Sequence, residues 1–246
     1  MKIFIDPGHG GADPGAVNGS RHEARDVLRL ALAVSELLEK RGASVQMSRT
    51  DNLGLNLNER TTMANNGRAD FLLSLHRNSA NSQEAMGIET WVHTAASSAA
   101  LRVASLVQQK LCAVATQANR GVRAGDYHML RESKMPAILV ELGFISNATD
   151  NTLFDQFFDK YAAAIAEGIC EAFEIAAPVV LAAELPLPVH WAETDYNYLT
   201  QEAGITIGEK RYNDNITRGE VFALLARTIR KTVSQIDCNT LQQETA

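Results

Sequence analysis

Short apolar segments alternate with amphipathic segments through residues 1–175, and this alternation constrains the fold more than any other feature. Five segments have the length and composition of strands: Lys2–Ile5, Ser44–Ser48, Phe71–Leu75, Gly87–His93 and Ala137–Leu142. Four have the periodicity of helices: Glu23–Arg41, Asn58–Gly67, Ser97–Ala118 and Leu153–Ile175. Strands separated by helices are typical of an α/β domain. We therefore predict a mostly parallel, twisted sheet flanked by helices.

The composition changes after Ile175. Residues 176–188 read AAPVVLAAELPLP, with prolines at 178, 186 and 188 and no amphipathic period, which predicts a linker. Residues 189–246 contain two further helical patterns, and Thr217 to Glu220 fit a capping box at the start of the second. We expect a domain at 1–175 followed by a small, mainly helical module.

Charge and cysteine content exclude several classes of protein. The net charge is -6 and the isoelectric point about 5.5, which argues against nucleic acid as the main partner. The three cysteines are scattered singly, so no disulfide framework is expected. No apolar run approaches the roughly 20 residues of a membrane span.

Polar residues that can bind a metal come at the predicted strand ends. His9 follows the first strand, His76 follows Phe71–Leu75, and Glu141 ends the apolar run that begins at Ala137. In parallel sheets the carboxyl ends of strands meet at one edge, which Glu23 at the start of the first helix can also reach. Two imidazoles and a carboxylate form a catalytic zinc set, and a second carboxylate would move protons. Spacing alone leaves open that these residues only form caps or hydrogen bonds.

Ordered motifs extend over residues 2–175: IDPGHGGADPGA, SRTD, LNERTTMANNGRADFLLSLHRNSA, GIETWV, NRGVRAGDYHMLRES and MPAILVELGFISN. Together they resemble the zinc amidases that cleave N-acetylmuramoyl-L-alanine bonds in peptidoglycan. The resemblance implies that His9, Glu23 and His76 hold one Zn²⁺ per catalytic domain. It also implies that Glu141 is the catalytic carboxylate.

Three residues near these motifs are candidates for contacts with substrate. Arg77 stands where the family commonly has a small residue, and it would either bind a substrate carboxylate or point to solvent. Asn78 follows His76 closely enough to support the metal site or contact substrate. His128, in a predicted loop-to-strand segment, is expected near the cleft. Arg49 and Arg60 are expected to form structural ion pairs.

The segment from His190 to Arg230 resembles a single S-layer-homology unit, with HWAE, a Gly-Ile turn and ITRGE opening a helix. One interpretation is attachment to a secondary wall polymer. The other is a helical appendage that packs on the catalytic domain or mediates dimerisation.

These features support three hypotheses for function. The first is a phage endolysin that hydrolyses the bond between N-acetylmuramic acid and L-alanine. The second is a mother-cell or autolytic amidase of a bacterium, and the third is a non-catalytic wall-binding protein. The apolar stretch at Ile3–Ile5 is too short for the core of a signal peptide. We therefore expect synthesis in the cytoplasm and action on the wall after release.

Overall fold

The computed structural model describes residues 1–176. The predicted linker beyond Ala176 and the predicted module at 189–246 lie outside the described residues. The roles expected of that module, in wall attachment or dimerisation, are therefore not tested by the structure. In the described part, no helix is long and apolar enough to cross a membrane.

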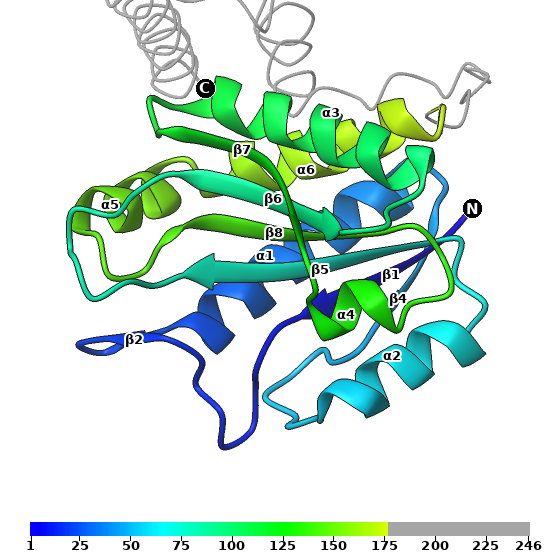
Figure 1. The fold of residues 1–246 in the computed structure, drawn as a ribbon, viewed down its shortest axis with the longest axis horizontal. Coiled ribbons are helices and arrows are strands. Elements are labelled where there is room, and N and C mark those ends of the chain that lie inside the picture. The colour runs from blue at the N-terminus through cyan, green and yellow to red at the C-terminus, as the bar shows by residue number, and fades with distance from the viewer. Residues whose placement is uncertain (177–246) are drawn as a thin grey trace, which may run out of the picture. The chain divides into compact units, whose positions relative to one another are not determined.

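The centre of the fold is a six-stranded sheet with the strand order β4-β1-β5-β8-β6-β7 (Figure 1). All neighbouring strands are parallel except β6 and β8, which pair antiparallel. The predicted α/β fold with a mostly parallel sheet is therefore confirmed. The strands are β1 (Lys2–Pro7), β4 (Ser44–Met47), β5 (Phe71–Asn78), β6 (Ile88–His93), β7 (Asn119–Gly125) and β8 (Ala137–Phe144).

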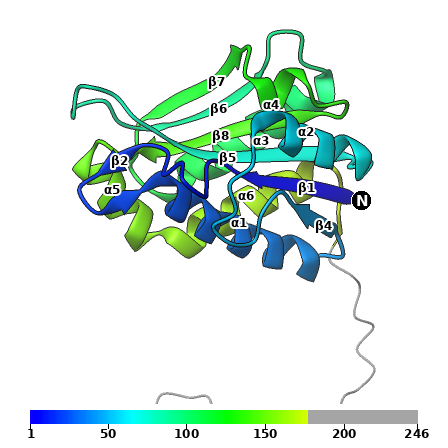
Figure 2. The same ribbon diagram turned by 90° about the horizontal axis from the view of Figure 1, so that it is seen from below.

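Helices cover both faces of this sheet (Figure 2). On one face lie α1 (Glu23–Lys40), α3 (Ser98–Val114) and α6 (Phe158–Ala172). On the other face lie α2 (Leu57–Asn66) and the short α4 (His128–Arg131). The remaining elements are α5 (Ala148–Gln156) and the two-residue strands β2 (Val17–Asn18) and β3 (Arg21–His22), which pair antiparallel.

The apolar stripe of α1 explains how that helix is held on the sheet. Its residues Val27, Leu30, Ala31, Val34 and Leu38 recur at helical spacing, and all five have no exposed surface. Complete burial of one valine or leucine side chain stabilises a fold by roughly 1.5–3 kcal/mol. The stripe therefore fixes α1 firmly, and with it the residue at the start of the helix.

The structure corrects several predicted elements. The helix predicted at Leu153–Ile175 is two helices, α5 and α6, which meet at Phe157 with φ -114° and ψ 21°. Apolar residues continue across this break, so periodicity alone does not reveal it. The helix predicted at Ser97–Ala118 ends at Val114. The sequence analysis missed β7 because this edge strand is mostly exposed and lacks apolar alternation.

Candidate metal centre

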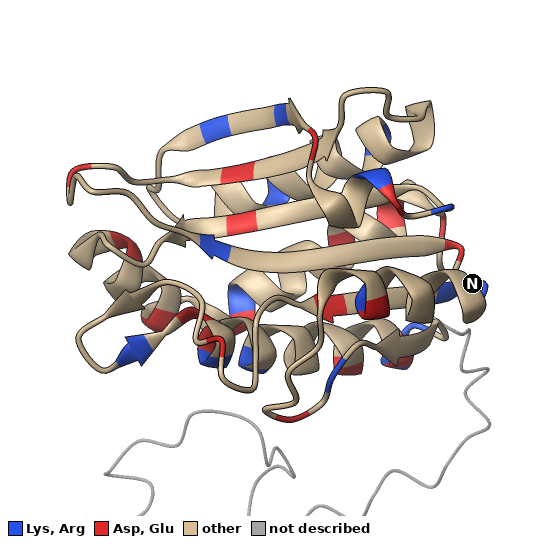
Figure 3. Ribbon diagram, turned by 60° about the horizontal axis from the view of Figure 1, so that its bottom comes forward, with Lys and Arg blue, Asp and Glu red and all other residues tan. Residues whose placement is uncertain are grey.

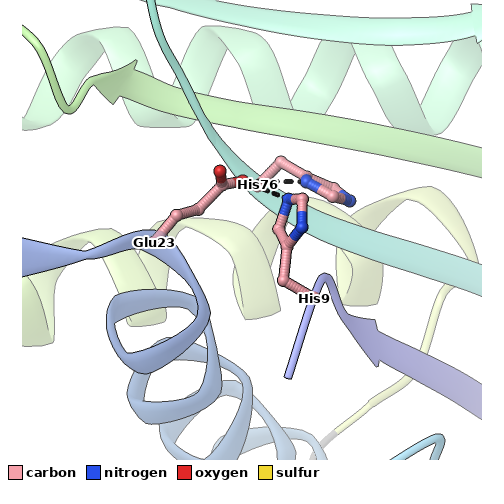
Figure 4. Close-up of side chains that lie close together, drawn as sticks. All are labelled: His9, Glu23 and His76. Carbon is pink, nitrogen blue, oxygen red and sulfur yellow. Dashed lines mark hydrogen bonds and ion pairs between the residues drawn. The ribbon is translucent and has the colours of Figure 1, made fainter. Parts of the chain in front are cut away.

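Three residues from different parts of the chain meet beside the sheet (Figure 4). His9 follows β1, Glu23 is the first residue of α1, and His76 lies in β5. The Oε1 atom of Glu23 lies 3.1 Å from Nε2 of His9 and 2.9 Å from Nδ1 of His76. Potential ligand atoms of all three residues lie within 4.8 Å of one another. The structure thus brings together the residues predicted to hold a metal.

Two buried arginines hold the loop that carries His9. Arg60 forms an ion pair with Asp6 at 2.9 Å and donates to the carbonyl oxygen of His9 at 2.6 Å. Arg49 donates to the carbonyl oxygens of Gly8 and Ala24, at 2.7 and 2.9 Å. The expected ion pair is therefore found for Arg60, whereas Arg49 joins the loop to α1 through backbone oxygens. These contacts sustain the positive φ of His9, 61°, which is unusual for a residue with a side chain.

Two glycines allow the backbone to approach the metal-binding side chains. A Cβ atom at Gly8 would lie 2.2 Å from the ring of His76. A Cβ atom at Gly15 would lie 2.7 Å from both Glu23 and His9, and its φ of 65° is itself unfavourable for larger residues. Larger side chains at these two positions would displace the candidate ligands.

The three residues shift one another's protonation equilibria. Burial opposes the charged form of His9, but hydrogen bonds and charge from Glu23 and Asp13 outweigh it and raise the His9 pKa to about 9. Burial likewise opposes charge on Glu23, yet the two histidines hold its pKa well below the usual range. The pKa of His76 is raised by Glu23 and Glu141 despite its burial. Glu23 is therefore an anion that attracts cations to this point.

The surroundings of these side chains fit a zinc ion. Imidazole nitrogen and carboxylate oxygen are common zinc ligands, and ligating histidines commonly place their second nitrogen against a carboxylate. Asp13 Oδ2 lies 2.8 Å from Nδ1 of His9. Glu23 is oriented by the backbone N–H groups of Ala16 and Arg77, which donate to its two oxygens at 2.9 and 3.1 Å. The group therefore has both the ligands and the outer contacts of a catalytic zinc site.

Glu141 lies on the strand next to His76. The two residues are paired in register across the parallel strands β5 and β8. The Oε2 atom of Glu141 is enclosed and has no hydrogen-bond partner among the described residues. Burial raises the pKa of this carboxyl to about 7, opposed in part by His76. An unpartnered carboxyl with that pKa, beside the histidines, is suited to proton transfer.

An open cavity of about 650 Å³ leads to the two histidines. Asp13, Leu57 and His128 contribute to its wall, together with His9 and His76. His128 therefore lies beside the cleft, as expected, but it begins the short helix α4 and does not belong to a loop-to-strand segment. Its Nε2 atom lies 3.4 Å from the hydroxyl of Thr61.

The structure contradicts both expectations for Arg77. Its side chain is fully buried and donates to Asp26 at 2.7 Å, so it neither points to solvent nor offers its charge to substrate. Neighbouring residues of a strand face opposite sides of the sheet, which places Arg77 away from the cavity beside His76. Asn78 donates to Glu89 at 2.6 Å, and no contact joins its side chain to the three candidate ligands.

Sequence reasoning missed two carboxylates that contribute to this region. Asp13 lies in the loop after His9, where no periodic pattern distinguishes it. Glu89 is buried as the second residue of β6, where it accepts from Asn78 and Arg120. A charged residue inside a strand pattern was a signal that could have indicated Glu89.

Comparisons with known proteins extend over the part of the chain that holds these residues. The profile of a family described as N-acetylmuramoyl-L-alanine amidase matches residues 3–172. The sporulation-specific N-acetylmuramoyl-L-alanine amidase of Bacillus subtilis (strain 168) is 37% identical over 179 residues, which cover 71% of this chain and 69% of that protein.

Solved structures give the same result. The catalytic domain of CwlV, an N-acetylmuramoyl-L-alanine amidase from Bacillus (Paenibacillus) polymyxa var. colistinus, is 35% identical with a TM-score of 0.66. The match covers 71% of this chain and 98% of that domain. The catalytic domain of the CD27L endolysin, targeting Clostridia difficile, is 27% identical with a TM-score of 0.60, and covers 70% of this chain and 97% of that domain.

Proposed function

The chain belongs to the N-acetylmuramoyl-L-alanine amidase family and is an amide hydrolase of peptidoglycan. We propose that His9, Glu23 and His76 hold one zinc ion in this enzyme, and that Glu141 moves protons during the reaction. The convergence of the three side chains within 4.8 Å is the observation that carries this proposal. Because the chain is an enzyme, the hypothesis of a non-catalytic wall-binding protein is set aside.

The proposed zinc ligands are two neutral imidazoles and one carboxylate, a set that leaves a position for water or substrate. A zinc ion there would supply Lewis acidity, which polarises an amide carbonyl and makes water more acidic. The protein's part is to fix the ligands in place. Asp13 orients the ring of His9, and Arg60 holds the carbonyl of the same residue, so the His9 ligand has little freedom.

Glu141 is proposed to act as general base and then as general acid. Its carboxylate would take a proton from the attacking water and deliver it to the nitrogen of L-alanine as the amide bond breaks. The location beside His76 and the unpartnered Oε2 atom support this role, because the oxygen is free to accept that proton. The cavity in front of His9 and His76 gives the glycan-peptide junction a route to the proposed metal ligands.

We propose further that the biological role is that of a bacterial wall amidase, acting in autolysis or sporulation. The Bacillus subtilis sporulation amidase and CwlV are 37% and 35% identical to this chain, whereas the endolysin domain is 27% identical. These similarities favour the hypothesis of a mother-cell or autolytic bacterial amidase over that of a phage endolysin.

Digestion of purified peptidoglycan tests the proposed reaction. Cleavage by the zinc-loaded protein should release peptides with free N-terminal L-alanine and should create no new reducing sugar ends. Mass spectrometry together with amino-group and reducing-end assays distinguishes these products. New reducing ends without free L-alanine would contradict amidase activity, because they arise only from cleavage within the glycan.

A further inference from the structure

The sheet surface that carries Glu141 continues across β6 onto the edge strand β7. Glu141 pairs with Glu89 in the antiparallel β8–β6 ladder, and Glu89 pairs with Gly121 of β7. Residues directly opposite each other in neighbouring strands share a face of the sheet. The next pair on this face, two residues along, is Trp91 with Arg123. A continuous surface therefore extends from the proposed catalytic carboxyl to the edge of the sheet.

Two arginines of β7 give this surface a positive charge. Arg120 donates to Glu89 at 2.9 Å, and Arg123 donates to the same carboxylate oxygen at 3.3 Å. Glu89 is buried, whereas 34% of the Arg120 side chain and 45% of the Arg123 side chain is exposed. One carboxylate facing two guanidinium groups leaves a net positive charge with donors open to solvent. In Figure 3, bands coloured for Lys and Arg lie on the edge strand β7, and bands coloured for Asp and Glu lie on β6 and β8.

Aromatic rings hold the guanidinium groups of Arg120 and Arg123, hereafter the arginine pair. Arg123 lies 5.0 Å from the ring centroid of Trp91, and Arg120 lies 4.9 Å from that of Phe144. Tyr127 packs edge-on against Trp91 at 5.1 Å. Stacked and ion-paired arginines lose less freedom on binding, so the arginine pair is prepared to accept an anion. The other charged groups nearby, Asp126 and Arg131, pair with each other.

We infer that the arginine pair binds a carboxylate of the stem peptide, on the L-alanine side of the bond that is cut. This inference rests on the proposed function. Neighbouring strands lie about 4.8 Å apart, and Glu89 is paired with Glu141 on the neighbouring strand. Because the arginine pair contacts Glu89, its guanidinium groups lie a little more than one strand spacing from Glu141. An extended peptide advances about 3.3–3.6 Å per residue. The carboxylate of the second stem residue is therefore within reach of the arginine pair, whose guanidinium groups can bind it in bidentate fashion.

Two soluble muropeptides that differ only at the second stem residue test this inference. One carries a free carboxylate there and the other a carboxamide. The wild-type enzyme should have the lower KM for the carboxylate form. Arg120→Gln and Arg123→Gln should each raise that KM roughly tenfold, the effect of losing one charged hydrogen bond, while kcat and the KM for the carboxamide change little. Each single variant leaves one arginine to neutralise Glu89.

Arg102→Gln provides the matched control, because Arg102 belongs to α3 on the opposite face and pairs with Glu174. It should leave both KM values unchanged. Circular dichroism and thermal melting establish that all variants are folded. Calorimetry with the stem dipeptide and the zinc-loaded Glu141→Gln protein measures binding apart from cleavage, and adding Arg123→Gln should weaken it by a similar factor.

Two results would overturn the inference while leaving the proposed function intact. One is equal KM values for the two muropeptides in the wild-type enzyme. The other is an arginine variant that keeps the wild-type preference for the carboxylate. If the wild-type enzyme cleaves neither muropeptide, the proposed function fails, and the inference that rests on it fails too.

Discussion

The Oδ2 atom of Asp13 lies 2.8 Å from Nδ1 of His9, on the side of the ring opposite the nitrogen that faces Glu23. The same carboxylate accepts the backbone N–H of Gly15 at 2.9 Å, so its own position is defined. A carboxylate in this place selects the tautomer of His9 that presents a lone pair at Nε2. Asp13 is thus a positioning residue for the proposed metal ligand.

Asp13→Asn should weaken zinc binding by about 10–100-fold, because an amide holds the imidazole less firmly and makes it a poorer base. Competition with a chromophoric chelator measures the change in zinc affinity. Asp126→Asn is the matched control, because Asp126 lies 3.5 Å from His93, which is no candidate ligand. Equal zinc affinity in Asp13→Asn and wild type would show that Asp13 does not position His9.

Glu141→Gln should retain zinc and lose about 10²–10⁴-fold in kcat, because the amide has the shape of the carboxyl but cannot carry the proton. Zinc content and turnover of a soluble muropeptide are measured on one preparation. Glu132→Gln, at the exposed end of α4, serves as control and should keep full activity. A Glu141→Gln enzyme within a few-fold of wild type would remove Glu141 from the mechanism.

Arg77→Met should lower the free energy of unfolding by about 3 kcal/mol, because it leaves the buried Asp26 with fewer partners. Arg77 also donates to the carbonyl of Leu142 and lies over the ring of Phe154, so several contacts are lost together. Urea denaturation of the zinc-loaded proteins measures the difference. The exposed Arg131→Met should cost less than about 1 kcal/mol. A similar small loss for Arg77→Met would contradict the structural role assigned to Arg77.

The stability of the metal-free protein should fall as the pH rises through about 9. The pKa of His9 is raised from 6.5 to about 9, because the pull of Glu23 and Asp13 outweighs the effect of burial. Protonated His9 therefore stabilises the fold fully below pH 6.5, and this contribution disappears as His9 loses its proton. Thermal melting of chelator-treated protein across this range measures the effect.

Glu23→Gln is the control for this pH dependence, because it removes the group that chiefly raises the His9 pKa. Its melting temperature should vary less over the same range. Zinc-loaded protein should also vary less, because zinc binds the neutral imidazole at every pH in that range. An identical pH profile in wild type and Glu23→Gln would contradict the coupling between the two residues.

The sequence allowed the meeting of His9, His76 and Glu23 to be predicted, because carboxyl ends of parallel strands share one edge. The residues at which β5 and β8 end were not predicted correctly. β5 continues past the predicted end at Leu75 to Asn78, so His76 lies within the strand, and β8 continues past the predicted end at Leu142 to Phe144. Polar residues interrupt the apolar run that marks a strand, and a register shift between His76 and Asn78 adds a further irregularity.

The error at Arg77 has the same origin. When the strand is predicted to end at Leu75, strand alternation cannot be applied to Arg77. The residue is then expected at the surface, where it would contact substrate or solvent. Once β5 is extended, alternation places His76 and Arg77 on opposite faces of the sheet. The edge strand β7 could not be predicted, because exposed polar residues and glycines carry no signal of pairing. The arginine pair therefore became visible only in three dimensions.

Zinc titration of the chelated enzyme tests most directly whether His9, Glu23 and His76 form the metal centre of an amidase. Release of L-alanine-terminated peptide is measured as zinc is added, with His76→Ala and the non-ligand variant His93→Ala beside the wild type. Activity of the wild type and of His93→Ala should rise with zinc and saturate at one ion per chain, whereas His76→Ala should neither bind zinc tightly nor cleave. Full activity of the chelated wild type, or undiminished zinc binding by His76→Ala, would contradict the account.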